Sequence, residues 1–377
     1  MNLKKKSLEV LKSLQLKNGG IMATPKSGAY PYIYPRDAVM MTVALNSAGL
    51  HRESEKFYYF MRKFAKLKSY GEVFQRYNCN GLPCVTRKNE NDNEGLVLYG
   101  IYEVYKHSKN ETFIQNMWDF IEEIVGCIFS YFRQGLVKTE KGLHEFYALE
   151  HGYDLWVNCA CWRGLSDAAK IAKILGHEEQ SKIWLKKANE LKKNIFNKFY
   201  EKKKGFYIKN PINLNSPDIS QLAPFYFEMD NLKKRLRKTM DYLKKHIWDE
   251  DIGGFKRFRK FEICKDWHWY TGGSGSWCVF TIWGARFYKE LGNEKMYKKC
   301  VEWLEKIAFE NNGLLPEHIA RKEEYDEWEA HEIEFNLRII NEMKEIEKKF
   351  KKSGNKKIIY WAVPLGWSHA EYLLLKN

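Results

Sequence analysis

The chain has 377 residues, of which 44% are hydrophobic, so it can bury one large core or two smaller ones. Its net charge of +15 suggests a nucleic-acid partner, but the lysines are spread along predicted helix faces, and no RNP, zinc-finger or helix-turn-helix signature accompanies them. The first apolar run, 8–16, is short and interrupted by polar residues, so we predict no signal peptide, no membrane span and a soluble cytoplasmic protein.

Helical periodicity dominates the chain from end to end, and strand alternation is scarce. Phe113, Met117 and Phe120, for example, recur at three- and four-residue steps, as on the buried stripe of a helix. The same test predicts twelve helices, at 2–16, 35–49, 53–68, 92–107, 111–133, 155–175, 178–199, 217–228, 231–248, 273–292, 294–310 and 366–376. A thirteenth, 326–352, is highly charged and belongs to a predicted insertion, 321–358, within a single domain of 1–377.

The connections between these helices alternate in length. Short ones, such as 51–54 and 108–111, alternate with long ones, and every long connection precedes an even-numbered helix. Because neighbouring helices run antiparallel, all the even helices start at one end, and the long loops collect there. This order predicts an all-α, (α/α)6 toroid with one decorated rim, where we expect the functional site.

The long loops are rich in aromatic side chains, Arg-Asp pairs and isolated carboxylates. A sugar needs this mixture, because its C–H faces stack on aromatic rings while its hydroxyls bond to Arg and carboxylate groups. No Ser-His-Asp arrangement is evident, and the glycine-rich 272–276 follows no strand and lacks a lysine, which argues against a phosphate loop. The rim therefore predicts a carbohydrate pocket.

The eight cysteines are scattered, and their spacings match no zinc or redox signature. We interpret them as reduced core thiols. We assign no metal ligand and no cofactor, and leave metal dependence and oligomeric state open.

Five segments resemble the glucoamylases and their relatives, glycoside hydrolase family fifteen, in the prokaryotic form. In chain order they are YPYIYPRDA, QRYNCNG with NDNEGLVLYGIYE, GGFKRF, GLLPEH and VPLGWSHAEYLLL, spread from about residue 30 to the C-terminus. The resemblance implies an exo-acting, inverting hydrolase that removes glucosyl units from the non-reducing ends of α-glucans. Such an enzyme needs a protonated carboxyl group and an ionised one about 6.5–9.5 Å apart.

The resemblance also implies which carboxyl groups react. Glu317 in GLLPEH falls on the family's base motif, although a surface glutamate near a helix end is the plain alternative. The acid motif is altered here, and an alignment with a two-residue deletion places Glu150 at the general acid. A rival alignment through YDLW puts Val157 there and leaves no acid, and Glu145 is a further candidate.

The same resemblance implies a set of sugar-binding residues. Arg36 and Asp37 match the pair that holds the terminal glucosyl ring, although Asp37 has the alternative role of a helix cap. Trp277 and Asp92 also have structural alternatives, a helix start and a helix cap. The predicted set is Tyr32, Tyr34, Arg36, Asp37, Asp92, Arg257, Trp277 and Trp367.

Several functions stay open at this point. A trehalase or an isomaltose-preferring enzyme would use the same acid and base, and a degenerate glucan-binding protein or a sugar epimerase would use the same toroid. The chain begins almost directly with the first predicted barrel helix, so we expect short maltooligosaccharides or glycogen ends as substrates rather than raw starch.

Overall fold

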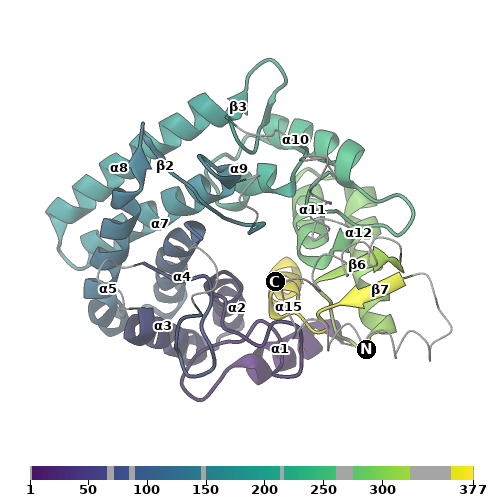
Figure 1. The fold of residues 1–377 in the computed structure, drawn as a ribbon, viewed down its shortest axis with the longest axis horizontal. Helices are drawn as coiled ribbons and strands as arrows, with labels where there is room; N and C mark the ends of the chain where they lie inside the picture. The colour runs from purple at the N-terminus through teal and green to yellow at the C-terminus, as the bar shows by residue number, and fades with distance from the viewer. Residues whose placement is uncertain are drawn as a thin grey trace.

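The computed structural model describes residues 2–65, 72–84, 90–145, 150–212, 216–259, 275–322 and 358–376. Figure 1 shows these residues as a closed ring with two layers of helices. The inner layer contains α2 (Pro35–Ser47), α4 (Asp92–Ser108), α7 (Leu155–Ile174), α9 (Ala223–Tyr226, after the 3-10 turn Ile219–Leu222), α11 (Cys278–Glu290) and α15 (Gly366–Lys376). The outer layer contains α1 (Leu3–Leu14), α3 (His51–Ala65), α5 (Glu111–Ser130), α8 (Glu178–Phe199), α10 (Lys233–Ile247) and α12 (Glu294–Glu310).

The inner helices pack on one another in the order of the chain. Helix α2 packs on α4, α4 on α7, α7 on α9, α11 on α15, and α15 back on α2. Helices α9 and α11 meet through aromatic rings, among them Tyr226 and Trp283, whose centroids are 4.5 Å apart. The predicted even-numbered helices are therefore the inner layer, and the first turns of α2, α4 and α7 meet through Arg36, Asp92 and Trp156.

Burial separates the two layers as their sequences predict. Outer helix α8 buries one stripe, which includes Trp184, Leu191 and Phe199, whereas almost all of α2 is buried. Where α4 crosses α7, two glycines allow the backbones to touch: a Cβ on Gly164 would lie 2.5 Å from the carbonyl oxygen of Gly95. The crossing therefore requires glycine.

Short strands, which were not predicted from the sequence, also form part of the rim. Two antiparallel hairpins pair β1 (Phe132–Arg133) with β2 (Leu136–Val137) and β3 (Tyr200–Glu201) with β4 (Phe206–Tyr207). A three-stranded antiparallel sheet joins β5 (Ser276–Trp277), β6 (His318–Arg321) and β7 (Ile358–Trp361), with β6 in the middle. The predicted helix 273–292 accordingly begins only at Cys278, after β5.

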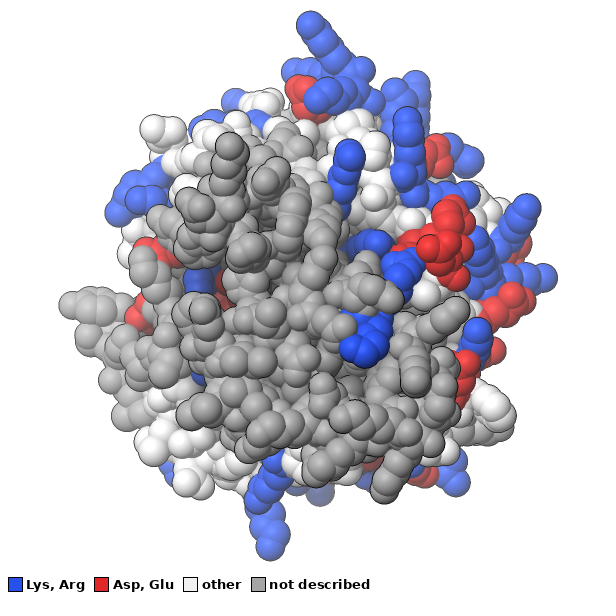
Figure 2. All heavy atoms as spheres, turned by 45° about the vertical axis from the view of Figure 1, so that its right-hand side comes forward, with Lys and Arg blue, Asp and Glu red and all other residues white. Residues whose placement is uncertain are grey.

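The predicted charged insertion, 321–358, lies mostly outside the described residues, but its two ends are visible. Arg321 and Ile358 pair across β6 and β7, so the chain leaves and re-enters the toroid at adjacent positions. On the face drawn in Figure 2, Lys and Arg side chains project at the edges of the molecule with Asp and Glu among them. Among the described helices, none is long and apolar enough to span a membrane.

Candidate active site

Arg36 lies in the first turn of α2, where three carboxylates surround its guanidinium group. Nε donates to Asp92 over 2.8 Å, Nη2 donates to Glu90 and to the carbonyl of Gly142 over 2.8 Å, and Nη1 lies 3.5 Å from Glu145. Burial alone lowers the pKa of Arg36, but Asp92 and Glu90 raise it above its ordinary value. The arginine therefore stays cationic and joins α2 to two separate rim segments, 90–92 and 142–145.

Asp37 follows Arg36 and is 8% exposed. Burial raises the pKa of this carboxyl group to about 7; Arg36 opposes the rise, and the charges of Glu317 and Glu145 add to it. The predicted alternative, a helix cap, does not describe its place, because Tyr34 holds the N-cap position. Glu145 and Glu317 thus lie close enough to Asp37 to act on its carboxyl group electrostatically.

Glu317, the predicted base, lies at the edge of the rim sheet with its side chain 15% exposed. Tyr30 donates its hydroxyl hydrogen to Glu317 Oε2 over 3.2 Å, and Trp361 Nε1 donates to that hydroxyl over 2.8 Å. His318 Nδ1 lies 3.4 Å from the same carboxylate oxygen. The carboxylate is therefore oriented by neighbours but still reaches solvent.

The loop that carries Glu317 is fastened to the first turn of α15. Ser368 Oγ donates to the carbonyl of Pro316 over 2.7 Å, and the amide of Leu315 donates to His369 Nε2 over 3.0 Å. The amide of Glu317 itself donates to the carbonyl of Trp361 over 2.9 Å. These backbone bonds fix the direction in which the carboxylate leaves the loop.

Glu150, the predicted acid, is completely buried. Its carboxylate accepts hydrogen bonds from the amides of Gly142 (3.0 Å) and His144 (2.8 Å), and Lys209 Nζ lies 3.6 Å away. Burial by itself raises the pKa of Glu150, but Lys209, His144 and the two amide bonds lower it below its ordinary value. At this position Glu150 is an ionised anchor for the 142–144 loop.

Glu145, the further candidate for the acid, lies at the end of that anchored loop. Its backbone φ is +59°, and its side chain is 21% exposed. Gln75 Nε2 donates to its Oε2 over 2.7 Å, and Arg36 Nη1 lies 3.5 Å from its Oε1. Glu145 therefore points to the side of the loop where Arg36 and Asp37 lie.

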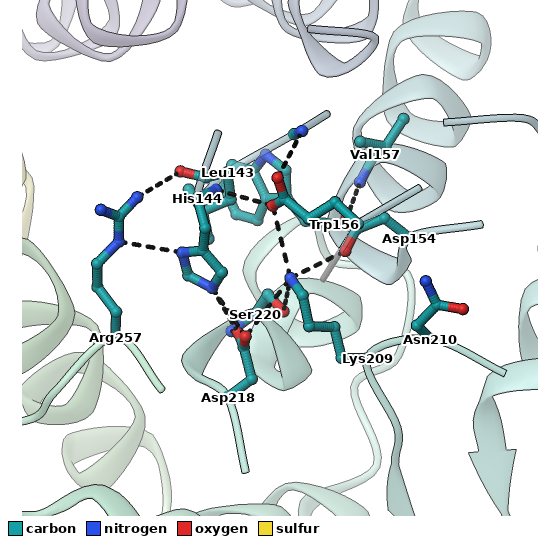
Figure 3. Close-up of polar contacts among 12 residues, drawn as sticks. Leu143, His144, Asp154, Trp156, Val157, Lys209, Asn210, Asp218, Ser220 and Arg257 are labelled. Carbon is teal, nitrogen blue, oxygen red and sulfur yellow. Dashed lines mark hydrogen bonds and ion pairs between the residues drawn. The ribbon is translucent and has the colours of Figure 1, made fainter. Parts of the chain in front are cut away.

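Arg257 and Trp277 contact each other, and Figure 3 shows Arg257 with its bond to His144. Arg257 Nε donates to His144 Nδ1 over 3.1 Å, and Nη2 donates to the carbonyl of Leu143 over 3.1 Å. The guanidinium group lies 4.3 Å from the Trp277 ring centroid, and that ring stacks on His318 at 4.9 Å. The arginine therefore links the Glu145 loop to the neighbourhood of Glu317.

The two predicted pocket tyrosines lie beside Tyr30. The Tyr34 ring meets Tyr30 and Tyr32 edge to face, at 6.3 and 6.5 Å between centroids. Arg76 Nη1 donates to the Tyr34 hydroxyl over 3.1 Å, and the Arg76 guanidinium carbon lies 4.8 Å from the Tyr32 ring centroid. Arg76 was absent from the predicted set.

The last two predicted sugar-binding residues lie deeper. Asp92 is completely buried and accepts hydrogen bonds from Arg36 and, over 2.7 Å, from Trp156 Nε1, so it supports Arg36 from behind. Trp367 is 6% exposed, and its Nε1 donates to Glu371 over 3.1 Å within the inner layer. Asp92 and Trp367 are therefore more deeply buried than the partly exposed carboxylates Glu145 and Glu317.

Comparison with known proteins places the chain in a family. Residues 90–358, more than half of the chain, match the family model described as Glycosyl hydrolases family 15. The chain belongs to this family. The description of the family model is that of glycosyl hydrolases.

Individual relatives in and around family 15 agree with this placement. An uncharacterized glycosyl hydrolase of Methanocaldococcus jannaschii is 25% identical over 339 residues, 85% of this chain and 52% of that protein. Trehalase 2 of Sulfolobus acidocaldarius is 24% identical over 231 residues, 51% of this chain and 38% of that protein. A bacterial glucoamylase complexed with acarbose matches 99% of this chain and 55% of its own, with TM-score 0.72 and 19% identity. The predicted (α/α)6 toroid is confirmed, and the chain spans about half or less of these relatives.

The predicted set of this family-15 chain lacks four residues that hold the candidate site. They are Tyr30, Gln75, Arg76 and His144, which contact Glu317, Glu145, Tyr34 and Arg257, respectively. Tyr30 begins the same YPYIYPRDA stretch that carries Arg36, so its position was a usable signal. Among the described residues, no group of three or more His, Cys, Asp or Glu side chains is arranged to hold a metal ion.

Proposed function

We propose that this family-15 chain is an exo-acting, inverting α-glucosidase of glucoamylase type, which releases glucose from the non-reducing ends of α-glucans or maltooligosaccharides. The observation that carries the proposal is the shared electrostatic environment of Asp37, Glu145 and Glu317. Two carboxylates beside a buried carboxyl group favour a proton on that group, so Asp37 brings a proton-holding carboxyl group to the site. A hydrolase with inversion uses one such group on each face of the sugar.

Glu317 is the base in this proposal. It would remove a proton from a water that attacks the anomeric carbon, while the Tyr30 hydroxyl, 3.2 Å from Oε2, holds the carboxylate in place. The partial exposure of the side chain and the fastening of its loop to α15 support this role. A base needs both access to water and a fixed direction.

We favour Glu145 as the acid over Glu150. A general acid must reach the leaving oxygen and hold a proton, whereas Glu150 is fully buried, and its pKa is lowered by Lys209. Glu145 is partly exposed and lies near Asp37, so it can reach a leaving group at the site. The prediction that Glu150 is the acid stays open to the variants described below.

The terminal ring would be held by the residues between the two carboxyl groups. No side chain among the described residues donates a hydrogen bond to Asp37, so its carboxyl group has acceptor sites for sugar hydroxyls. Tyr32 and Tyr34 supply ring faces on one side, and Arg257 with Trp277 supplies donors and a ring on the other. Asp92 and Trp367 complete the predicted set as supports.

A trehalase is the second candidate. The observation in its favour is the 24% identity to Trehalase 2 of Sulfolobus acidocaldarius. An enzyme that hydrolyses trehalose with inversion at the anomeric carbon would use the same acid and base, so only the leaving group separates the two proposals. We further propose a cytoplasmic location, which is supported by the free thiols of all seven cysteines in the described part of the chain.

Hydrolysis followed by NMR tests the reaction, the substrate and the stereochemistry together. The purified protein is incubated with maltotriose, maltose, isomaltose and trehalose, and the anomer released first is recorded. We expect β-glucose from the maltooligosaccharides. Release of α-glucose from maltotriose would contradict single displacement. Trehalose as the only substrate would favour the second candidate, and no glucose from any of them would favour a binding protein.

Three variants identify the acid and the base. α-Glucosyl fluoride has a leaving group that needs no protonation, so an enzyme without its acid still hydrolyses it, while an enzyme without its base does not. We expect Glu145→Gln to lose maltotriose turnover and keep much of its fluoride turnover, and Glu317→Gln to lose both. If Glu150→Gln shows the first pattern and Glu145→Gln does not, the acid is Glu150.

A further inference from the structure

Lys209 is a completely buried lysine with no part in the reaction proposed above. Its Nζ lies 3.0 Å from Asp154 Oδ2, 3.4 Å from Asp218 Oδ2 and 3.6 Å from Glu150 Oε1, and all four side chains are 0% exposed. Figure 3 shows the ammonium group at the centre of these contacts. Burial alone lowers the pKa of Lys209, but the three carboxylates raise it above its ordinary value, so the group is a buried cation.

One branch of contacts runs from Lys209 to Arg257. Asp218 accepts hydrogen bonds from His144 Nε2 at 2.8 and 2.9 Å, and His144 Nδ1 accepts one from Arg257 Nε at 3.1 Å. These partners fix the neutral tautomer with its proton on Nε2. Burial lowers the pKa of His144 to about 4, which agrees with a neutral ring. The orientation of Arg257 thus depends on a chain that ends at the Lys209 ammonium group.

A second branch runs from Lys209 to the loop that presents Glu145. Lys209 balances the charge of Glu150, whose two oxygens accept the amides of Gly142 and His144. These amides lie three residues and one residue before Glu145, so the position of the loop depends on a charged Glu150. Asp154, the third carboxylate, caps α7 by accepting the amide of Val157 over 3.0 Å.

A buried ion cluster with a purely structural role is expected to have no contacts that lead to the candidate site. Arg163, on α7, is also buried among carboxylates: it contacts Asp167 at 2.6 Å, Glu103 at 2.9 Å and Glu228 at 2.9 Å. None of these contacts reaches a residue of the candidate site. Both branches from Lys209, in contrast, end on groups that the proposed reaction uses.

We propose that Lys209 is a positioning residue that holds Glu145 and Arg257 in their working directions, through Glu150 on one side and through Asp218 and His144 on the other. The inference rests on the proposed function for its kinetic consequence, but not for its structural one. If the cation is removed, Glu150 and Asp218 are left buried without their counter-charge, and the contacts that they make with the loop weaken.

The test compares Lys209→Met with Arg163→Met, which also removes a buried cation from a group of carboxylates. Turnover of maltotriose and of α-glucosyl fluoride is measured for both, together with amide hydrogen exchange of the peptide that contains 142–145. For Lys209→Met we expect maltotriose kcat to fall about 100-fold, because a misplaced acid fails to protonate the leaving group, and fluoride kcat to fall less than about 10-fold. The 142–145 amides should exchange faster than in the parent protein.

Arg163→Met should affect both substrates equally and leave the exchange of 142–145 unchanged. If Lys209→Met behaves in the same way, or keeps full maltotriose turnover with unchanged exchange, the positioning role is overturned. If Lys209→Met does not fold, the double variant Lys209→Met/Glu150→Gln removes the cation and one anion together, and the same exchange and turnover measurements apply to it. A parent protein that hydrolyses neither substrate would contradict the proposed function, and the exchange result would still decide the role of Lys209.

Discussion

The backbone amide of Leu315, two residues before the proposed base Glu317, donates a hydrogen bond to Nε2 of His369 over 3.0 Å. Because Nε2 accepts this bond, the ring proton is on Nδ1, which donates to Ser7 Oγ over 2.9 Å. The neutral imidazole therefore connects α1, α15 and the loop of Glu317. A second proton on the ring would break the bond to Leu315.

This arrangement predicts a loss of stability in acid. Burial, with a smaller effect of Lys6, lowers the pKa of His369 from 6.5 to about 3. Between these values the unfolded chain binds a proton that the folded chain does not, so the contribution is complete above pH 6.5 and is lost as pH falls toward 3. At pH 4.5 the loss amounts to about 3 kcal/mol.

Urea unfolding of the parent protein and of His369→Gln at pH 7 and pH 4.5 measures this effect. Other groups titrate equally in both proteins, so only the difference between their free energies of unfolding counts. We expect the parent's advantage at pH 7 to shrink by about 2–3 kcal/mol at pH 4.5. An advantage that does not change with pH would mean that His369 is not buried in its neutral form.

Tyr30→Phe should weaken the proposed base. The change removes the hydroxyl that donates to Glu317 over 3.2 Å, and a hydrogen bond to a charged group is worth about 1.5–3 kcal/mol. We expect kcat to fall roughly 10- to 100-fold with little change in KM, measured by glucose release. Tyr34→Phe is the control, because its hydroxyl bonds to Arg76 and not to Glu317; equal losses in both variants would contradict a specific role of Tyr30.

The outer helices and the ring order were predictable from the sequence because they depend on local periodicity. Helices such as α5 and α8 each bury a single stripe, which the chain displays at three- and four-residue steps. The rim sheet was not predictable, because β5 has only two residues and its partner β6 lies about 40 residues further along the chain. Strands this short leave no alternation to recognise.

The candidate site was predictable where neighbours in sequence share a role, as Arg36 and Asp37 do. The location of Glu150 was not, because its burial and charge depend on Lys209, which the chain brings from a distant loop. Glu145 has a positive backbone φ, and its carboxylate, rather than that of Glu150, lies near Arg36. Such a choice depends on tertiary contacts that spacing does not contain.

The crossing of α4 and α7 predicts a strong effect of a single methyl group. In Gly164→Ala the new Cβ would lie 2.5 Å from the carbonyl oxygen and 2.8 Å from the Cα of Gly95, so one helix must move. We expect a loss of about 1–3 kcal/mol in the free energy of unfolding, as for other overpacked cores.

Gly126→Ala is the matched control for this substitution. Gly126 lies within helix α5 with nothing within 4 Å of the added Cβ, so alanine should stabilise the protein by about 0.5–1 kcal/mol. Both variants are compared with the parent protein by urea unfolding. Equal effects of the two substitutions would contradict the close backbone contact.

Arg36 should matter more for stability than any exposed arginine. Arg36→Met leaves Glu90, Asp92 and Glu145 without their common cation, and breaking a buried pair in this way costs about 3–5 kcal/mol. The exposed pair of Arg62 and Asp119 has the same chemistry at 2.9 Å, with side chains 38% and 45% exposed, and Arg62→Met should cost less than about 1 kcal/mol. Chemical unfolding compares the two, and similar costs would contradict the burial of the Arg36 cluster.

Arg36→Lys separates the charge of this residue from its shape. An ammonium group keeps the positive charge but cannot bond at once to Asp92, Glu90 and the carbonyl of Gly142, which the planar guanidinium group spans. We expect this variant to be more stable than Arg36→Met but to lose at least about 100-fold in kcat, because Glu145 and Asp37 lose their fixed neighbour. Glucose release from maltotriose measures the loss. Parent-like turnover in Arg36→Lys would mean that a positive charge at this position suffices for turnover. The planar guanidinium group of Arg36 would then not set the geometry of the acid.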